Sequence, residues 1–220
     1  AAMMPRGRRD AAIVGDAVAR LAPTSPRWPR GLWVCTTRLH DGERVVLDAD
    51  SGADLATAVA ASCAMAGFFA PVPIAGHDHI DGGARSVSNA DVVVDEDLDL
   101  VVVSSPMSID RAAAGPARGF APRLARRQRL GHGARLAREL AQVHSRGALV
   151  VSLEPGPEDV AVLGGCGASM DFGRRDAVAH QARDSTLRRF ASAPLAEVAS
   201  VLAGITSTLP SRAEPGVPVR

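Results

Sequence analysis

The sequence contains no tyrosine and few aromatic residues of any kind, since phenylalanine and tryptophan together make up 3% of its 220 residues. A core built without them depends on alanine, valine, leucine and isoleucine, which bury less area each. Lysine is absent too, so arginine side chains supply the positive charge, and the formal net charge is +1. A charge so balanced gives no general attraction to nucleic acid or to anionic membranes.

Cysteine and long apolar runs are also scarce. Cys35, Cys63 and Cys166 are an odd number of widely spaced thiols, which argues against a disulfide framework or a zinc site. Cys35 and Cys63 lie in apolar runs, so we expect them to be buried thiols in a reducing, cytoplasmic protein. No apolar run approaches the roughly 18 residues of a membrane span, and the first residues lack the apolar stretch of a signal peptide.

Periodicity predicts alternating strands and helices. Helical spacing indicates helices over residues 10–21, 54–65, 121–145, 174–190 and 195–204, and β-prone runs indicate strands over 31–37, 44–48, 71–74, 98–104 and 148–155. Asp10 is a candidate N-cap of the first helix, and the inner stripe of the helix at 121–145 is marked by Leu136, Leu140 and Val143. The strands at 98–104 and 148–155 are continuous apolar runs, as in a parallel sheet covered on both faces. The pattern predicts an α/β layered fold with a mostly parallel sheet.

One domain accounts for most of the chain. We expect it to span residues 1–205, with a long mobile loop at 106–121 that is rich in proline, alanine and glycine. The last segment, 206–220, is polar and contains proline, so we expect a disordered tail.

The triplet Asp81-Gly82-Gly83 is the feature that bears most on chemistry. Asp81 follows a short strand, and the two glycines can take positive φ or let another backbone come close. A carboxylate held there can act as a general base for a donor within hydrogen-bond reach. Asp-Gly is also the commonest hairpin-turn pair, so an ordinary turn explains the triplet equally well.

The residues around this triplet resemble the patatin-like phospholipase family, over about residues 28–190. The family has a small-residue helix with an alanine-serine pair, a glycine break, a Pro-Val strand, D-G-G or D-G-A, an Asn-Ala pair and a strand ending in Ser-Pro. The same features stand here in the same order: Ala61-Ser62, Gly67-Phe68-Phe69, Pro71-Val72, Asp81-Gly82-Gly83, Asn89-Ala90 and Ser105-Pro106. Residues 150–164 are similar to a strand and the loop after it, and 170–190 to the terminal helix.

The resemblance implies a three-layer α/β/α fold and a serine esterase or phospholipase that cleaves lipid or carboxylic esters without a cofactor or metal. It implies a Ser–Asp dyad in which Asp81 is the general base and Gly82 and Gly83 form the active-site turn. Lipid or ester substrates are then the expected partners, together with a peripheral membrane contact, and no nucleic acid is expected.

Two departures from the family pattern matter. Ala66 replaces the proline that usually precedes the helix-breaking glycine, which is a small change in loop stiffness. The nucleophile motif G-x-S-x-G and the glycine-rich oxyanion loop do not occur in these 220 residues. We therefore expect this chain to be the C-terminal part of the catalytic domain, with the N-terminal strands missing, and to be inactive alone. The alternative is a non-catalytic patatin-like pseudoenzyme or interaction domain.

Three other features suggest weaker alternatives. His77 and His79 would share one face of a strand, as metal ligands can, but no third ligand is evident. The glycine-rich segment 163–173 lacks the motifs of a phosphate-binding loop. Six arginines on one predicted helix could attract phospholipid headgroups or nucleic acid, although a solvated helix face explains them as well: Arg123, Arg126, Arg127, Arg129, Arg135 and Arg138.

Overall fold

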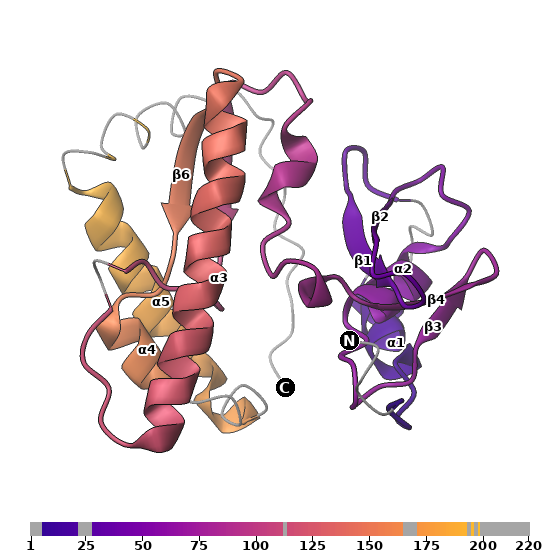
Figure 1. Ribbon diagram of the computed structural model, residues 1–220, viewed down its shortest axis with the longest axis horizontal. Helices are drawn as coiled ribbons and strands as arrows, with labels where there is room; N and C mark the ends of the chain where they lie inside the picture. Colours follow the sequence, from indigo (N-terminus) through magenta and orange to yellow (C-terminus); the bar gives the residue numbers. More distant parts are fainter. Residues whose placement is uncertain are drawn as a thin grey trace. The chain divides into compact units, whose positions relative to one another are not determined.

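The computed structural model describes residues 6–21, 28–111, 114–164 and 171–192, together with residues 195 and 198 (Figure 1). The chain forms two compact units, Ala1–Pro155 and Gly156–Arg220. The first unit carries all the described strands, and the second carries described helices only. Among the described residues, no helix is both long enough and apolar enough to cross a bilayer.

A four-stranded antiparallel sheet lies in the first unit. Its strands are β1 (Val34–Arg38), β2 (Arg44–Leu47), β3 (Val72–Ile74) and β4 (His77–Asp81), in the order β2-β1-β4-β3. Two tight hairpins connect neighbouring strands, and the β3–β4 hairpin turns through Ala75 and Gly76, both with positive φ. That backbone matches the right-handed twist of the flanking strands. Strand β4 is therefore an inner strand, paired on both sides.

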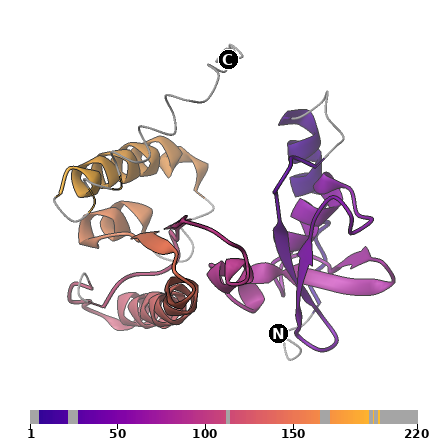
Figure 2. The same ribbon diagram turned by 90° about the horizontal axis from the view of Figure 1, so that it is seen from above.

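Two helices pack with this sheet (Figures 1 and 2). Helix α2 (Leu55–Ser62) begins at Asp54, whose carboxylate accepts a hydrogen bond from the Thr57 N–H, as in an ordinary N-cap. Its alanines pack into a core with valine, leucine and isoleucine of the strands: Val34, Leu47, Ala58, Ala61 and Ile74. The expected use of small aliphatic side chains in the core is confirmed.

Helix α1 (Ala12–Leu21) lies directly against α2. A side chain at Gly15 would place its Cβ 2.8 Å from the carbonyl oxygen of Ala56, so only glycine permits this approach. The Asp10 carboxylate accepts the Ala12 N–H at the start of α1, as the sequence predicts.

Strands β5 (Leu100–Ser104) and β6 (Leu149–Leu153) form a separate parallel pair. Helix α3 (Phe120–Ser145) connects them and packs against β6, as parallel strands require a crossover (Figure 1). Leu136 and Val143 on α3 are fully buried, in line with the expected inner stripe. The strands were expected to be buried on both faces, yet Val102 is 42% exposed and Leu149 is 49% exposed.

The described part of the chain is thus a mixed α/β structure. A parallel arrangement holds for β5 and β6, whereas the four-stranded sheet is antiparallel throughout. Residues 105–111 and 114–119 have no helix or strand, consistent with the loop expected there, although its mobility stays a prediction. The tail at 206–220 and most of the helix expected at 195–204 lie outside the described residues.

The second unit contains α4 (Pro157–Leu163) and α5 (Arg175–Phe190), preceded by the short turn η4 (Phe172–Arg174). Helix α5 confirms the helix expected near its position. The loop expected after the strand at 150–155 is wrong, because Pro157 occupies the first position of α4 and the Asp159 carboxylate accepts the Gly156 N–H. A proline at N1 and an acidic first turn favour a helix.

Candidate active-site carboxylate

Asp81 is the last residue of β4, so the backbone around it is held from two sides. In the sheet register it lies opposite Thr36 of β1. Its N–H donates to the carbonyl oxygen of Ala64, just beyond α2, at 3.0 Å. An inner strand paired in this way fixes the position from which the carboxylate projects.

The Asp81 carboxylate has one hydrogen-bond donor within the described part of the chain. The Gly83 N–H donates to Oδ1 at 2.6 Å, and Oδ2 remains open to a further donor. Burial raises the pKa of Asp81 above its usual value, and the Gly83 N–H opposes that rise. A carboxylate with a raised pKa is a stronger base than a free aspartate.

The two glycines after Asp81 are required for reasons of space. A Cβ on Gly82 would lie 2.3 Å from the carbonyl oxygen of Cys35 on β1, and a Cβ on Gly83 would lie 2.9 Å from Oδ1 of Asp81. The close backbone approach that the sequence predicts is therefore confirmed. Positive φ is not used here, because neither Gly82 nor Gly83 is among the residues with positive φ.

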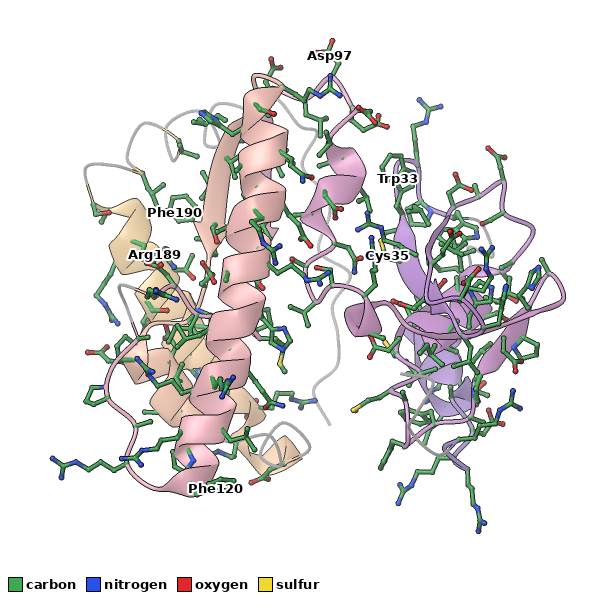
Figure 3. All side chains as sticks on the ribbon, in the orientation of Figure 1. Trp33, Cys35, Asp97, Phe120, Arg189 and Phe190 are labelled. Carbon is green, nitrogen blue, oxygen red and sulfur yellow. The ribbon has the colours of Figure 1, made fainter. Side chains whose placement is uncertain are left out.

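The carbonyl of Cys35 also contacts the alanine-serine pair of α2. The hydroxyl of Ser62 donates to this oxygen at 2.8 Å. One carbonyl on β1 thus accepts from α2 and packs against the turn after Asp81. Figure 3 shows Cys35 on β1, at the strand that the turn approaches. Ser62 therefore has a structural role in this arrangement.

Asn89 closes the loop that follows the glycines. It has φ of +47°, a left-handed conformation that asparagine tolerates better than most residues. Its side-chain amide donates to the carbonyl oxygen of Ser86 at 2.5 Å and weakly to that of Gly82 at 3.5 Å. The Asn89 side chain thereby connects the far end of the loop to the turn at Gly82.

Glu139 of α3 holds the same loop from another element. Its Oε1 accepts from the Ser86 hydroxyl at 2.6 Å, and its Oε2 accepts from the Ser88 hydroxyl at 2.6 Å and the Ala90 N–H at 3.1 Å. Glu139 is only 7% exposed. A buried carboxylate with three donors is well satisfied, so it fixes the loop strongly.

Arg44 of β2 adds a second ionic anchor. Its guanidinium donates to both carboxylate oxygens of Asp91, at 2.5 and 2.8 Å, and to Oδ1 of Asn89 at 3.2 Å. The guanidinium lowers the pKa of Asp91 and keeps it ionised. This planar, bidentate geometry is specific to arginine.

Sequence reasoning missed both anchors. Leu136, Leu140 and Val143 define the expected inner stripe of α3, and Glu139 lies three residues after Leu136 and four before Val143, on the same side. An acidic residue at an apolar spacing in a helix that is otherwise basic is the signal that could have identified it. Arg44 gave no such signal, because its partner is 47 residues away.

The two described cysteines differ from the prediction of buried thiols. Cys35 is half-buried, and burial raises its pKa. Cys63 is exposed, so the prediction is wrong there: it is the C-cap residue just after the end of α2. Partial burial and the nearby charge of Asp81 raise the pKa of Cys63. Cys166 lies outside the described residues.

The alternative sites receive little support. His79 is buried and its Nδ1 lies 2.9 Å from the Thr36 hydroxyl, while His77 stacks on His40 in the exposed hairpins. Asp78 forms an ion pair with Arg6 at 2.6 Å. Across the residues that the structure describes, no group of three His, Cys, Asp or Glu side chains could hold a metal ion. The centre of the glycine-rich segment, residues 165–170, is outside them.

Comparison with known protein families identifies the segment that carries this carboxylate. Residues 8–94 match the family model described as Patatin-like phospholipase. The match includes Asp81, Gly82, Gly83 and Asn89, and it extends the resemblance upstream to α1. It ends before β5, so the resemblance of later residues up to 190 stays a prediction. A comparison with curated proteins gave no match.

The close approach at Gly82 gives a first testable prediction. We expect Gly82→Ala to lower the free energy of unfolding by about 2 kcal/mol or more, because the backbone of β1 must move to admit the methyl group. Gly131→Ala is the matched control: nothing lies within 4 Å of that Cβ in α3, and alanine should stabilise the helix by up to about 1 kcal/mol. Urea unfolding followed by tryptophan fluorescence reports on the first unit, which contains Trp28 and Trp33. Equal effects of the two substitutions would contradict this reading.

The Glu139 contacts give a second prediction. Glu139→Ala leaves two hydroxyls and one N–H of the loop without their acceptor, so we expect a loss of about 2–4 kcal/mol in the free energy of unfolding. Glu96→Ala removes an exposed carboxylate of the same unit and should change it by less than about 0.5 kcal/mol. Hydrogen exchange should show faster exchange at Ala90 in the first variant. An unchanged rate of hydrogen exchange at the Ala90 N–H would rule out Glu139 as an anchor of the loop.

The raised pKa of Asp81 gives a third prediction, with a defined sign. The folded chain binds this proton more tightly than the unfolded chain, whose value is near 3.8, so ionisation of Asp81 costs stability as pH rises above that value. Asp81→Asn should therefore be more stable than the natural chain at pH 7, and the difference should shrink as pH is lowered toward 3.8. Asp78→Asn, at an exposed ion pair, should show little change. Chemical unfolding at several pH values measures this, and a destabilised Asp81→Asn would refute it.

Proposed function

Because residues 8–94 are patatin-like, we propose that the protein is an acyl hydrolase for lipid or carboxylic esters, with Asp81 as the general base of a Ser–Asp dyad. The observation that carries this proposal is the placement of Asp81 within the matched segment. The carboxylate stands at the end of an inner strand, and one of its oxygens is held by the Gly83 N–H. Within the described part of the chain, the other oxygen accepts no hydrogen bond.

The proposed reaction uses Asp81 directly, without a histidine relay. The carboxylate takes the proton of the serine hydroxyl as the serine oxygen attacks the ester carbonyl. The alcohol then leaves with that proton, and an acyl-serine remains. Asp81 next takes a proton from water as the water oxygen attacks the acyl-serine. It then returns this proton to the serine oxygen as the C–O bond to serine breaks and the acid leaves. Burial raises the pKa of Asp81, and a higher pKa favours each proton uptake.

Polar contacts hold the loop that follows Asp81, and this favours a rigidly positioned general base. Asn89, Glu139 and Arg44 hold the loop after the glycines from three directions. A base on a rigid support keeps its oxygen within reach of the reacting proton, because small displacements cost large factors in rate. No metal or organic cofactor is part of this proposal, and the substrates are lipids or short-chain esters.

The serine and the oxyanion loop would come from sequence outside these 220 residues, in a three-layer α/β/α domain with a mostly parallel sheet. The parallel pair β5–β6 supports this arrangement, because its apolar side chains at Val102 and Leu149 are open to further packing. A cytoplasmic location is part of the same proposal. The alternative is a patatin-like interaction domain without catalysis, favoured by the absence of G-x-S-x-G in the sequence.

Asp81→Asn provides the decisive test of the dyad. In a gene product that includes the G-x-S-x-G segment, we expect this change to lower kcat/KM for p-nitrophenyl butyrate by about 10⁴-fold, as when a triad carboxylate is replaced. Asp78→Asn, on the same strand, should leave the rate within about twofold. In the active protein, kcat/KM should fall as pH drops through the raised pKa of Asp81. The 220-residue chain alone should show no activity and no labelling by a fluorophosphonate.

The gene sequence upstream of Ala1 separates the two hypotheses. An in-frame G-x-S-x-G after a glycine-rich strand supports the hydrolase. A stop codon just before Met3 supports the interaction domain, and Asp81 would then be a turn residue. Labelling of the 220-residue chain by a fluorophosphonate would contradict both.

A further inference from the structure

The outward face of α3 combines exposed apolar side chains with arginines. Phe120, Arg123, Leu124 and Arg127 follow the spacing of one helix face, and all four are exposed. Phe120 is 84% exposed and Leu124 is 49% exposed. Figure 3 shows Phe120 at the beginning of the helix. Exposed apolar patches that are rimmed by polar side chains often mark sites of interaction with a protein or a membrane.

The charge around this face has a single sign. From Arg111 to Arg138 the sequence has eight arginines and no acidic residue, although the whole chain is nearly neutral. Across the described residues, Arg127 forms no hydrogen bond or ion pair, and Arg123 has only a 3.4 Å contact with the carbonyl of Ala117. The positive charge of the outward face is therefore not neutralised by neighbouring carboxylates.

The other side of α3 is fixed by contacts with Ile109 and Gly115, in the described parts of the preceding loop. Arg126 donates to the carbonyl of Gly115 at 2.8 Å, and the N–H of Ile109 donates to that of Arg129 at 3.3 Å. A Cβ on Gly133 would lie 2.3 Å from the carbonyl of Ile109. These contacts hold α3 in place on its inner side, so the position of its outward face is fixed as well.

We propose that the outward face of α3, formed by Phe120, Arg123, Leu124 and Arg127, binds the surface of an anionic lipid bilayer. Phenylalanine and leucine enter the boundary between headgroups and acyl chains, and the arginines contact lipid phosphates while their stems lie along the apolar region. The four residues lie outside the matched segment 8–94, so this inference does not depend on the proposed hydrolysis.

A bilayer fits this face better than a nucleic acid. Nucleic-acid binding would use the arginines for phosphates, but the phosphate backbone offers no partner to the two exposed apolar side chains, Phe120 and Leu124, on the same face. A lipid surface uses both kinds of side chain at once. Binding then has two contributions. Salt screens the contribution of the arginines, but it does not screen the contribution of the apolar side chains.

Vesicle flotation of the full 220-residue chain tests the proposal, and flotation separates bound protein from aggregates, which sink. We expect tighter binding to vesicles of phosphatidylcholine and phosphatidylglycerol in equal parts than to phosphatidylcholine alone. The double variant R123Q/R127Q should bind the anionic vesicles about thirtyfold more weakly, since each arginine near such a surface contributes about fivefold. Glutamine keeps a high helix propensity, so the fold should be preserved.

Two further variants complete the experiment. F120Q/L124Q should lose the binding that remains in high salt, because that part depends on the apolar side chains. R8Q/R30Q removes the same charge from two exposed arginines elsewhere in the first unit and should leave binding within about twofold. Circular dichroism melts should match among all variants.

Two results would overturn the proposal. One is equal binding to both kinds of vesicle, or binding that R123Q/R127Q and R8Q/R30Q reduce alike. The other is salt-dependent binding of an oligonucleotide that R123Q/R127Q abolishes and F120Q/L124Q leaves intact, without vesicle binding. That pattern would assign the face to nucleic acid.

Discussion

The carboxylate of Glu139 is the contact on which the loop after Asp81 depends. Two serine hydroxyls and one backbone N–H of that loop donate to it, and it lies almost entirely out of water. A buried carboxylate is stable only while its donors stay in place, so the loop and the helix specify each other. The turn at Gly82 connects this loop to β1. The backbone of β1 lies so close to Gly82 that no side chain larger than hydrogen fits at that position.

Local patterns predicted most of the individual elements. The helices α1, α2, α3 and α5 and five of the six described strands lie close to the positions that helical spacing and β-prone runs indicated. Strand β4 was not among the predicted strands. Pairing was harder to predict. Strand β4 pairs with β1, more than 40 residues earlier, and nothing in either strand alone distinguishes that antiparallel pairing from a parallel one. Helix α4 was missed because seven residues are too few for a clear periodicity.

The motif of the candidate site was predictable from the sequence, but the residues that surround and hold it were not. Asp81 and its two glycines stand out because a family pattern passes through them, and the close approach at Gly82 follows from the glycine itself. Glu139 and Arg44 contact the same loop from 53 and 45 residues away in the chain, through side chains that look like ordinary surface charges in the sequence. The helical spacing of Glu139 could have shown that it lies on the inner side of α3, but the partners of both side chains are visible only in the folded chain.

Helix α3 begins at Phe120, which is exposed, and carries Glu139 near its end, which is buried. Nineteen residues separate them, which is about 28 Å of helix. A single residue inserted between them would turn one end against the other by about 100° and withdraw either Phe120 or Glu139 from its face. The exposed positions in the middle of α3 should therefore tolerate substitutions far better than changes in length.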